Sequence, residues 1–163
     1  NISSSITEGD TVIRPSDYEY SIIREWLNNY FYGNAFNDEQ KGHIQDSYNK
    51  NEYTHIGLEP DPALKDTIDK VFLLSYKEVT STLYGFFNSD SRIAKASDFA
   101  RAHGLVNVPN DISSSSNWWT RTGFEYTPLF PAMVKYDGTA DKPYYPQGEN
   151  IGVRPAVKII IGE

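Results

Sequence analysis

Two adjacent tryptophans stand in the segment 117–123, which reads NWWTRTG. Its aromatic and β-branched residues are typical of a strand, and successive side chains in a strand face opposite sides. Trp118 and Trp119 therefore cannot both enter one core layer: we expect one in the main core and the other over a second layer or at the surface. Arg121 shares a face with Trp119, where its guanidinium can stack on the indole or hold a carboxylate or backbone carbonyls. We interpret all three as framework residues.

The stretch 21–36, SIIREWLNNYFYGNAF, predicts an amphipathic helix with Ser21 as its N-cap and an end at Gly33 and Asn34. A second helix is predicted directly after it, because Asn37 is followed three residues later by a glutamine, as in a capping box. The apolar positions of the first helix recur at helical spacing and are Ile23, Trp26, Leu27, Tyr30 and Phe31. Among them, the tryptophan is assigned to the framework.

The middle of the chain predicts one buried strand next to a polar segment. Residues 47–66 are polar and contain prolines, so we expect a loop with little regular structure. The run KVFLLS, residues 70–75, is almost continuously apolar, as in a buried central strand.

Two further helices are predicted from their caps. Ser75 and Glu78 stand at the spacing of a capping box, which predicts a helix over 76–83. Another short helix starts near Ser97, and Gly104 is suited to the position just after its end.

The last third of the chain changes to strand patterns. Residues 117–121, 132–139 and 153–161 have the composition of strands, and Asp137-Gly138 is the signal of a type I′ hairpin. Because helices come first and strands follow, the predicted fold class is α+β.

Length and charge limit the classes of partner. The 163 residues suit a single domain, residues 1–163, which we expect to be a module of a larger protein. The net charge of −7 and the lack of any Lys/Arg run disfavour nucleic acid and anionic membranes as partners. No apolar run approaches the roughly 18–20 residues of a membrane span, so no membrane insertion is expected. The chain starts at Asn1 without a methionine, which indicates a processed protein or an excised fragment.

Five motifs make the chain similar to an uncharacterised bacterial domain family: SIIREWLNNYFYGNAF, DKVFLLSYKEV, SRIAKASDFARAHG, WWTRT and IGVRPAVKI, in that order. The family pattern is S-x-x-R-x-W-L-N, FLLS, WW-x-R-S and a terminal GVRPA, and Thr122 departs from it where a serine is usual. The resemblance implies a C-type-lectin-like fold, in the branch that includes the formylglycine-generating enzymes and the variable proteins of diversity-generating retroelements. There the terminal G-[FV]-R strand is a structural hallmark, so Gly152 and Arg154 are assigned to the framework.

Catalytic and metal-binding chemistry has little support in the sequence. No cysteine is present, which excludes disulfides, thiolate metal sites and the chemistry that formylglycine generation requires. Glu59-Pro60-Asp61 offers oxygen ligands for Ca²⁺, but it precedes the apolar strand and no W-N-D follows, so we interpret it as a solvated loop. The three histidines lack metal-site spacing and no G-x-S-x-G occurs. We therefore expect no cofactor, no metal, no catalytic residue and no enzymatic activity.

Tyrosines with nearby amides and carboxylates gather in the late segments 122–131 and 140–150, and such surfaces suit sugar rings or a protein partner. We expect a non-catalytic binding module of a bacterial surface or secreted protein, extracellular or at the cell surface, with a glycan or a cell-surface protein as its ligand. Two alternatives stay open: a structural or assembly module that displays loops for protein–protein contact, and an enzyme of unknown type. The residues predicted to bind the ligand are Tyr126, Tyr136, Tyr144, Tyr145, Gln147, Glu149 and Asn150.

Overall fold

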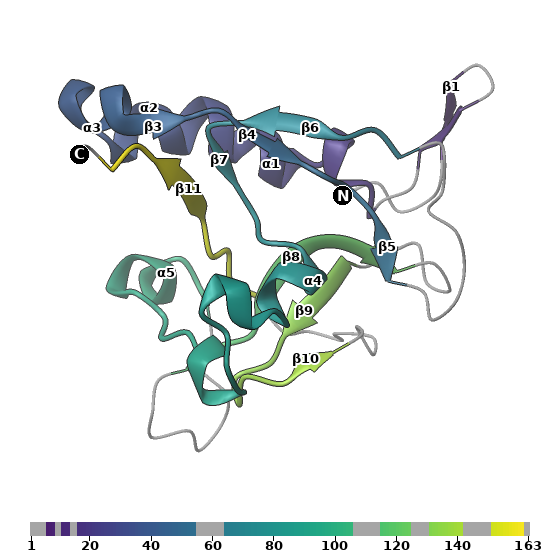
Figure 1. Ribbon diagram of the computed structural model, residues 1–163, viewed down its shortest axis with the longest axis vertical. Helices are drawn as coiled ribbons and strands as arrows, with labels where there is room; N and C mark the ends of the chain where they lie inside the picture. Colours follow the sequence, from purple (N-terminus) through teal and green to yellow (C-terminus); the bar gives the residue numbers. More distant parts are fainter. Residues whose placement is uncertain are drawn as a thin grey trace.

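Short helices and several small, mostly antiparallel sheets make up the structure, which confirms the α+β class (Figure 1). The computed structural model describes residues 6–8, 11–13, 16–54, 64–105, 115–124, 131–141 and 151–161. Its helical elements are η1 (Tyr18–Tyr20), α1 (Ile22–Trp26), the π-helical η2 (Leu27–Phe31), α2 (Tyr32–Ala35), α3 (Asp38–His43), α4 (Tyr76–Val79), η3 (Thr82–Tyr84), η4 (Asp90–Arg92) and α5 (Asp98–Ala102). Within the described part of the chain, no helix has the length and apolar character to span a bilayer.

The strands are β1 (Ile6–Glu8), β2 (Thr11–Ile13), β3 (Ile44–Gln45), β4 (Ser47–Asn49), β5 (Tyr53–Thr54), β6 (Thr67–Asp69), β7 (Val71–Phe72), β8 (Trp118–Phe124), β9 (Pro131–Val134), β10 (Ala140–Asp141) and β11 (Ala156–Ile159). One sheet has the order β10-β9-β8-β5, and another has the order β3-β11-β7. The pairs β1-β2 and β4-β6 form two smaller sheets. The short β5 pairs in parallel with β8, and Gly152 forms a parallel bridge with Trp118. In Figure 1, β7 and β11 run between the half that holds α1–α3 and the half that holds α4, α5 and β8–β10.

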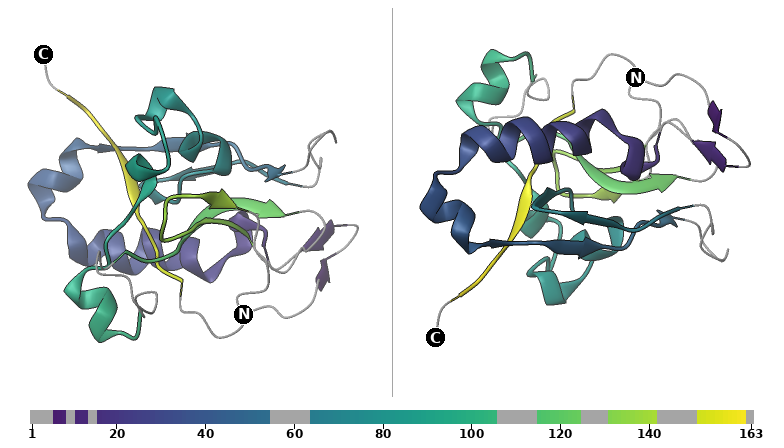
Figure 2. Two further views of the ribbon diagram at one scale, coloured as in Figure 1. Left: turned by 90° about the horizontal axis from the view of Figure 1, so that it is seen from below. Right: turned by 90° about the horizontal axis from the view of Figure 1, so that it is seen from above.

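One continuous helix is formed by α1, η2 and α2, because the residues that join them keep right-handed helical dihedral angles (Figure 2). Ser21 caps its start as predicted, by accepting a hydrogen bond from the backbone N–H of Arg24. The helix ends at Ala35, beyond the predicted end, and Phe36 then has an extended backbone. Near this end the side chain of Asn34 donates to the carbonyl of Tyr30, one turn earlier in the same helix.

Both predicted capping boxes are present. In α3 the Asn37 and Gln40 side chains bond each other's backbone N–H, and in α4 Ser75 and Glu78 do the same. The helix α4 is shorter than predicted, because Ser81 caps a separate 3-10 turn, η3, only two residues after α4 ends.

Within the predicted loop 47–66, the described residues include two short strands. Strand β4 pairs with β6, and β5 pairs with β8, so their hydrogen-bond partners are distant in sequence. The predicted strand over 70–75 is shorter than expected and pairs only at Val71 and Phe72. Beyond it, the carbonyls of Leu73 and Leu74 accept hydrogen bonds from the side chain and backbone of Arg121.

Two hydrophobic clusters lie on the two sides of β8. Trp118 is buried with Val79, Phe86 and Val134 in one cluster, whereas Trp119 packs against the other, which contains Tyr18, Leu27, Val71 and Leu73. The predicted division of the two tryptophans between faces is therefore confirmed, and β8 lies between the two clusters.

The hairpin that joins β9 to β10 differs from the predicted type I′ turn. Ala140 pairs with Val134, so the loop spans 135–139 rather than two residues. Gly138 has a φ of 78°, and a Cβ there would lie 1.8 Å from the carbonyl oxygen of Ser89. Glycine is therefore required both by the backbone angle and by the close approach of a neighbouring segment.

Candidate functional site

A pocket of about 680 Å³ opens between the long α1–η2–α2 helix, the helix α5 and the segment 151–155. Its volume lies in the range of about 300–1,000 Å³ that is typical of small-molecule sites. The helix and α5 face each other across this part of the molecule, with the C-terminal segment between them (Figure 1). The lining residues share an aromatic and aliphatic character and are Trp26, Tyr30, Phe31, Asn34, Ala35, Ser97, Phe99, Ala100, His103, Leu105, Ile151, Gly152, Val153 and Pro155.

The first wall is the aromatic face of the long helix. Trp26 stacks on Tyr30, with 6.3 Å between ring centroids, and lies 5.2 Å from the ring of Phe31. The contact at a spacing of five residues follows from the π-helical segment, because its wider turn brings residues i and i+5 onto one face. Tyr30 keeps 63% of its surface exposed, so its ring is open to a ligand.

The second wall is the helix α5. Ser97 caps its start, and Phe99 stacks on His103 with 4.1 Å between ring centroids. The positive φ of Gly104 then turns the chain, so that the N–H of Leu105 returns to the carbonyl of Ala100. Phe99 is 67% exposed and lines the pocket.

The third wall is the segment 151–155, which is fixed to β8. Gly152 donates to the carbonyl of Asn117 at 2.8 Å and accepts from the N–H of Trp119 at 3.0 Å. A Cβ on Gly152 would lie 3.2 Å from that Asn117 oxygen and from a methyl of Leu105. The tryptophan strand therefore positions this wall, and a larger residue at Gly152 would require its neighbours to shift.

Few polar groups face the pocket, and none of its described lining residues is Asp, Glu, Lys or Arg. The hydroxyl oxygen of Ser97 accepts the N–H of Ala100. The amide nitrogen of Asn34 donates to Tyr30, and Nδ1 of His103 bonds the carbonyl of Phe99 at 2.9 Å. Because a carbonyl only accepts, Nδ1 of His103 carries the hydrogen, which leaves Nε2 as an acceptor in the neutral ring.

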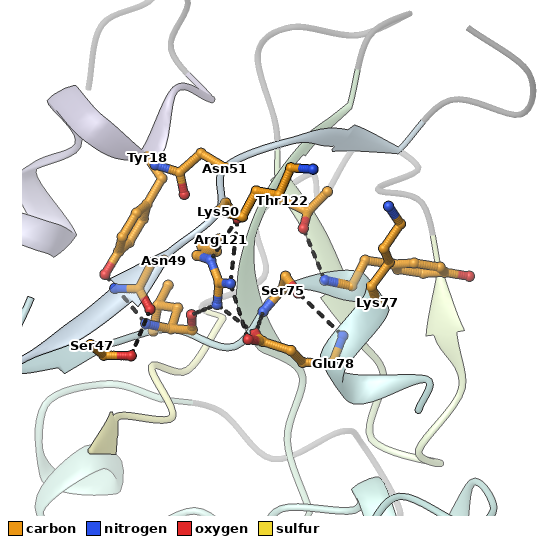
Figure 3. A network of polar contacts seen from close by, with 12 residues as sticks. Tyr18, Ser47, Asn49, Lys50, Asn51, Ser75, Lys77, Glu78, Arg121 and Thr122 are labelled. Carbon is orange, nitrogen blue, oxygen red and sulfur yellow. Dashed lines mark hydrogen bonds and ion pairs between the residues drawn. The ribbon is translucent and has the colours of Figure 1, made fainter. Parts of the chain in front are cut away.

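Arg121 lies apart from the pocket in a buried polar network (Figure 3). Its guanidinium donates to both carboxylate oxygens of Glu78, at 2.5 and 3.1 Å, to the Leu73 carbonyl at 2.7 Å and to the Lys50 carbonyl at 3.4 Å. Burial on its own would raise the pKa of Glu78, but the hydrogen bonds from Arg121 and the Ser75 backbone hold that pKa below its usual value. The Arg121 donors therefore bond groups within the protein and are not free to bind a ligand.

A second buried network surrounds Asp69. Its carboxylate accepts from Arg24 at 2.7 Å, from the side chains of Asn49 and Thr67 at 2.9 and 2.7 Å, and from Asn28 at 3.3 Å. The charge is thus compensated within the protein, and the network joins the long helix to the β4-β6 sheet. Within the described residues, no three His, Asp or Glu side chains gather as a metal site.

Of the residues predicted to bind a ligand, Tyr136 lies in the part of the chain that the structure describes. Tyr136 is exposed in the β9–β10 hairpin, where its N–H donates to Asn117, and it does not line the pocket. The segment that carries most of the others ends directly before the pocket residue Ile151. The predicted residues that lie outside the described part are Tyr126, Tyr144, Tyr145, Gln147, Glu149 and Asn150, as does the Glu59-Pro60-Asp61 triplet.

The framework residues have different surroundings. Trp26 and Gly152 line the pocket, Trp118 and Trp119 pack on the two sides of β8, and Arg121 is in the buried network. The pocket aromatics Tyr30, Phe31 and Phe99 were not among the predicted ligand-binding residues. The pairs Trp26/Tyr30 and Phe99/His103, each four residues apart on a helix, were the available signal for them.

One family model matches the chain, over residues 2–161, and it describes a domain of unknown function (DUF6273). This match agrees with the resemblance to an uncharacterised domain. Comparison with curated proteins and with solved structures gave no match.

Proposed function

The chain belongs to this family of domains of unknown function, and from that premise we propose that it is a non-catalytic binding module whose ligand is a glycan or a partner at the cell surface. The observation that carries the proposal is the aromatic pocket between the long helix, α5 and the segment 151–155. Concave sites with an apolar lining and a few placed polar groups are the usual form of small-ligand sites.

A glycan suits the lining better than most other ligands. A pyranose ring has one or two faces of C–H groups, which pack on aromatic rings, and an edge of hydroxyls, which need hydrogen-bond partners. Tyr30 and Phe99 present exposed rings on opposite walls, while Ser97, Asn34 and His103 supply polar atoms beside them.

Binding is proposed instead of catalysis because of the side chains that line the pocket. Among the described lining residues, the titratable groups are His103 and Tyr30. The imidazole of His103 is oriented by its bond to the Phe99 carbonyl and stacks on the Phe99 ring, which is a packing role. No carboxylate is present beside it in the described lining to form an acid–base pair.

The proposal includes a C-type-lectin-like fold and a place outside the cell, on a surface or in a secreted protein. The pairing of Gly152 with the strand that holds Trp118 and Trp119 supports this fold, since the resemblance implies a terminal G-V-R segment in the framework. The loops 122–131 and 140–150 remain the ligand surface that the sequence predicts, and we propose the pocket as an additional part of it.

A glycan array followed by calorimetry tests the proposal. We expect wild-type protein to bind at least one glycan, and we expect Tyr30→Ala and Phe99→Ala to weaken that binding about tenfold or more. Tyr84→Ala is the matched control, because Tyr84 is also an exposed tyrosine (57%) but lies outside the pocket lining. The variant Tyr144→Ala/Tyr145→Ala tests the loop separately. An array without any bound glycan, or equal binding by Tyr30→Ala and Tyr84→Ala, would contradict the pocket proposal.

A second candidate function, protein–protein contact by a structural or assembly module, is favoured by one surface feature. Leu83, Tyr84 and Phe87 are 92%, 57% and 76% exposed within five residues of chain. Clustered exposed apolar side chains are typical of protein interfaces. Crosslinking in the intact parent protein should detect this contact in the wild type. The variant Leu83→Ser/Phe87→Ser should lose the crosslink and keep its glycan binding.

A further inference from the structure

We propose, resting on the binding function above, that the pocket prefers a neutral pyranose that carries an acetamido group, such as an N-acetylhexosamine. Three properties of the described lining lead to this ligand class: its lack of charge, its excess of apolar surface, and the donor and acceptor that it leaves unused.

The first property is the absence of charge. Charged residues make up 23% of the chain, yet none lines the described pocket. The nearest guanidinium groups along the chain are committed elsewhere: Arg101 donates to the Ala96 carbonyl, and Arg154 donates to the Arg92 carbonyl. A uronic acid or an amino sugar would lose its hydration without gaining an opposite charge. The pocket therefore discriminates against both signs of charge.

The second property is the ratio of apolar to polar lining. The three walls supply aromatic and aliphatic side chains, with only a few polar atoms among them. A fully hydroxylated hexose would leave several hydroxyls without partners, which costs free energy for each buried group. An acetamido group replaces one hydroxyl with a planar amide that ends in a methyl group, and both the amide face and the methyl can pack on the exposed rings of Tyr30 and Phe99.

The third property is the pair of hydrogen-bonding groups left for a ligand. Ser97 uses its hydroxyl oxygen to cap α5, and no described residue accepts its hydroxyl hydrogen, so it remains a donor. Asn34 uses its amide N–H₂ on the Tyr30 carbonyl, and no described residue donates to its Oδ1, so it remains an acceptor. An amide presents one C=O and one N–H, which match one donor and one acceptor.

Four methyl β-glycosides of one ring test the inference: glucoside, 2-amino-2-deoxyglucoside, 2-acetamido-2-deoxyglucoside and glucuronide. Calorimetry should show that the acetamido glycoside binds about tenfold more tightly than the glucoside, because one or two additional net hydrogen bonds contribute about that much free energy. The cationic amino glycoside and the anionic glucuronide are expected to bind more weakly than the glucoside.

A matched pair of variants identifies the donor. Asp and Asn both cap helices about as well as Ser, so Ser97→Asp and Ser97→Asn both preserve the start of α5. Ser97→Asp has no hydrogen to donate and should lose the preference for the acetamido glycoside, while Ser97→Asn keeps an N–H₂ donor and should retain it.

The results separate this inference from the function on which it rests. If the glucoside or the glucuronide binds as tightly as the acetamido glycoside, the acetamido preference is overturned, while the binding module stands. If none of the four binds but the array shows another glycan, the preference is again overturned and the module stands. If no glycan binds at all, both proposals fall.

Discussion

Arg154 and Trp118 are stacked, with the guanidinium carbon 4.9 Å from the centroid of the indole ring. Both side chains also donate to the same acceptor, the backbone carbonyl of Arg92, each at 3.2 Å. The arginine lies within the segment 151–155 that forms the third wall, and the tryptophan belongs to a hydrophobic cluster. This pair therefore fixes the third wall of the pocket to the core of the protein.

Removing this stacked arginine should destabilise the fold. We expect Arg154→Ala to lower the free energy of unfolding by about 1–3 kcal/mol, through loss of the cation–π contact and of a hydrogen bond. Urea denaturation measures this value. Lys158→Ala, which removes an exposed cation from the following strand, is the control and should change little. Equal effects of the two variants would show that the stack contributes nothing.

Breaking the Arg121–Glu78 pair should cost more. Arg121→Met leaves the carboxylate of Glu78 partly buried without its guanidinium, and we expect a loss of about 3–5 kcal/mol in denaturant unfolding. In the double variant Arg121→Met/Glu78→Gln the buried charge is gone, so part of the loss should be recovered. Losses that simply add would contradict a direct coupling between the two side chains.

The same pair should make stability depend on pH. The pKa of Glu78 is depressed in the folded protein, because hydrogen bonds from Arg121 and the Ser75 backbone outweigh the opposing effect of burial. Stability from a depressed carboxyl pKa is fully present above the pKa of the unfolded glutamate, about 4.3, and is lost as pH falls through the folded pKa. We expect melting temperatures to fall in acid below this point, and Glu78→Gln to show a shallower fall. Parallel acid profiles for the two proteins would rule out this contribution.

Trp119 should affect stability before it affects binding. It packs against the cluster around Tyr18, Leu27, Val71 and Leu73 and does not line the pocket. We expect Trp119→Ala to cost about 3 kcal/mol, the low end of the range for removal of a large aromatic side chain from a core. Thermal melts and glycan binding should be measured on the same sample. A variant that melts like wild type but no longer binds would reverse the framework assignment.

Two glycines with positive φ provide a matched test of close packing. A Cβ on Gly85 would meet no atom within 4 Å, whereas one on Gly138 would collide with the Ser89 carbonyl. Gly85→Ala should cost about 1–2 kcal/mol from its left-handed backbone alone. Chemical denaturation should show a clearly larger loss in the free energy of unfolding for Gly138→Ala, because the hairpin and the segment at Ser89 must separate. Equal losses in the two variants would mean that the segment at Ser89 moves away from Gly138 without a loss of stability.

Local signals in the sequence predicted the helix starts correctly. Ser21, Asn37, Ser75 and Ser97 all act as N-caps, because a cap depends on residues only a few positions away. The alternation of Trp118 and Trp119 was predictable for the same reason. Strands β4 and β5 were missed because they are short and polar, and because their partners, β6 and β8, are not neighbours in the sequence.

The pocket could not be predicted from local patterns. It needs three segments that lie far apart in the chain, and one of its walls is held by backbone bonds between Gly152 and the segment Asn117–Trp119. The π-helical segment was also missed, since its apolar positions fit an ordinary α-helix as well. The motif resemblance assigned Gly152 to the framework, without indicating that it pairs with the tryptophan strand or that a cavity lies next to it.

The π-helical segment 27–31 has a consequence for changes in chain length. The wider turn absorbs one extra residue, so deleting the exposed Asn29 would place Phe31 four residues after Trp26, the spacing that keeps two side chains on one face of an α-helix. Deleting a residue elsewhere in the helix would instead rotate everything after it by about 100° and turn Asn34 away from α5. The helix can therefore lose its extra residue at this segment and keep its alignment with the pocket, and sequences that lack it can present the same set of side chains to a ligand.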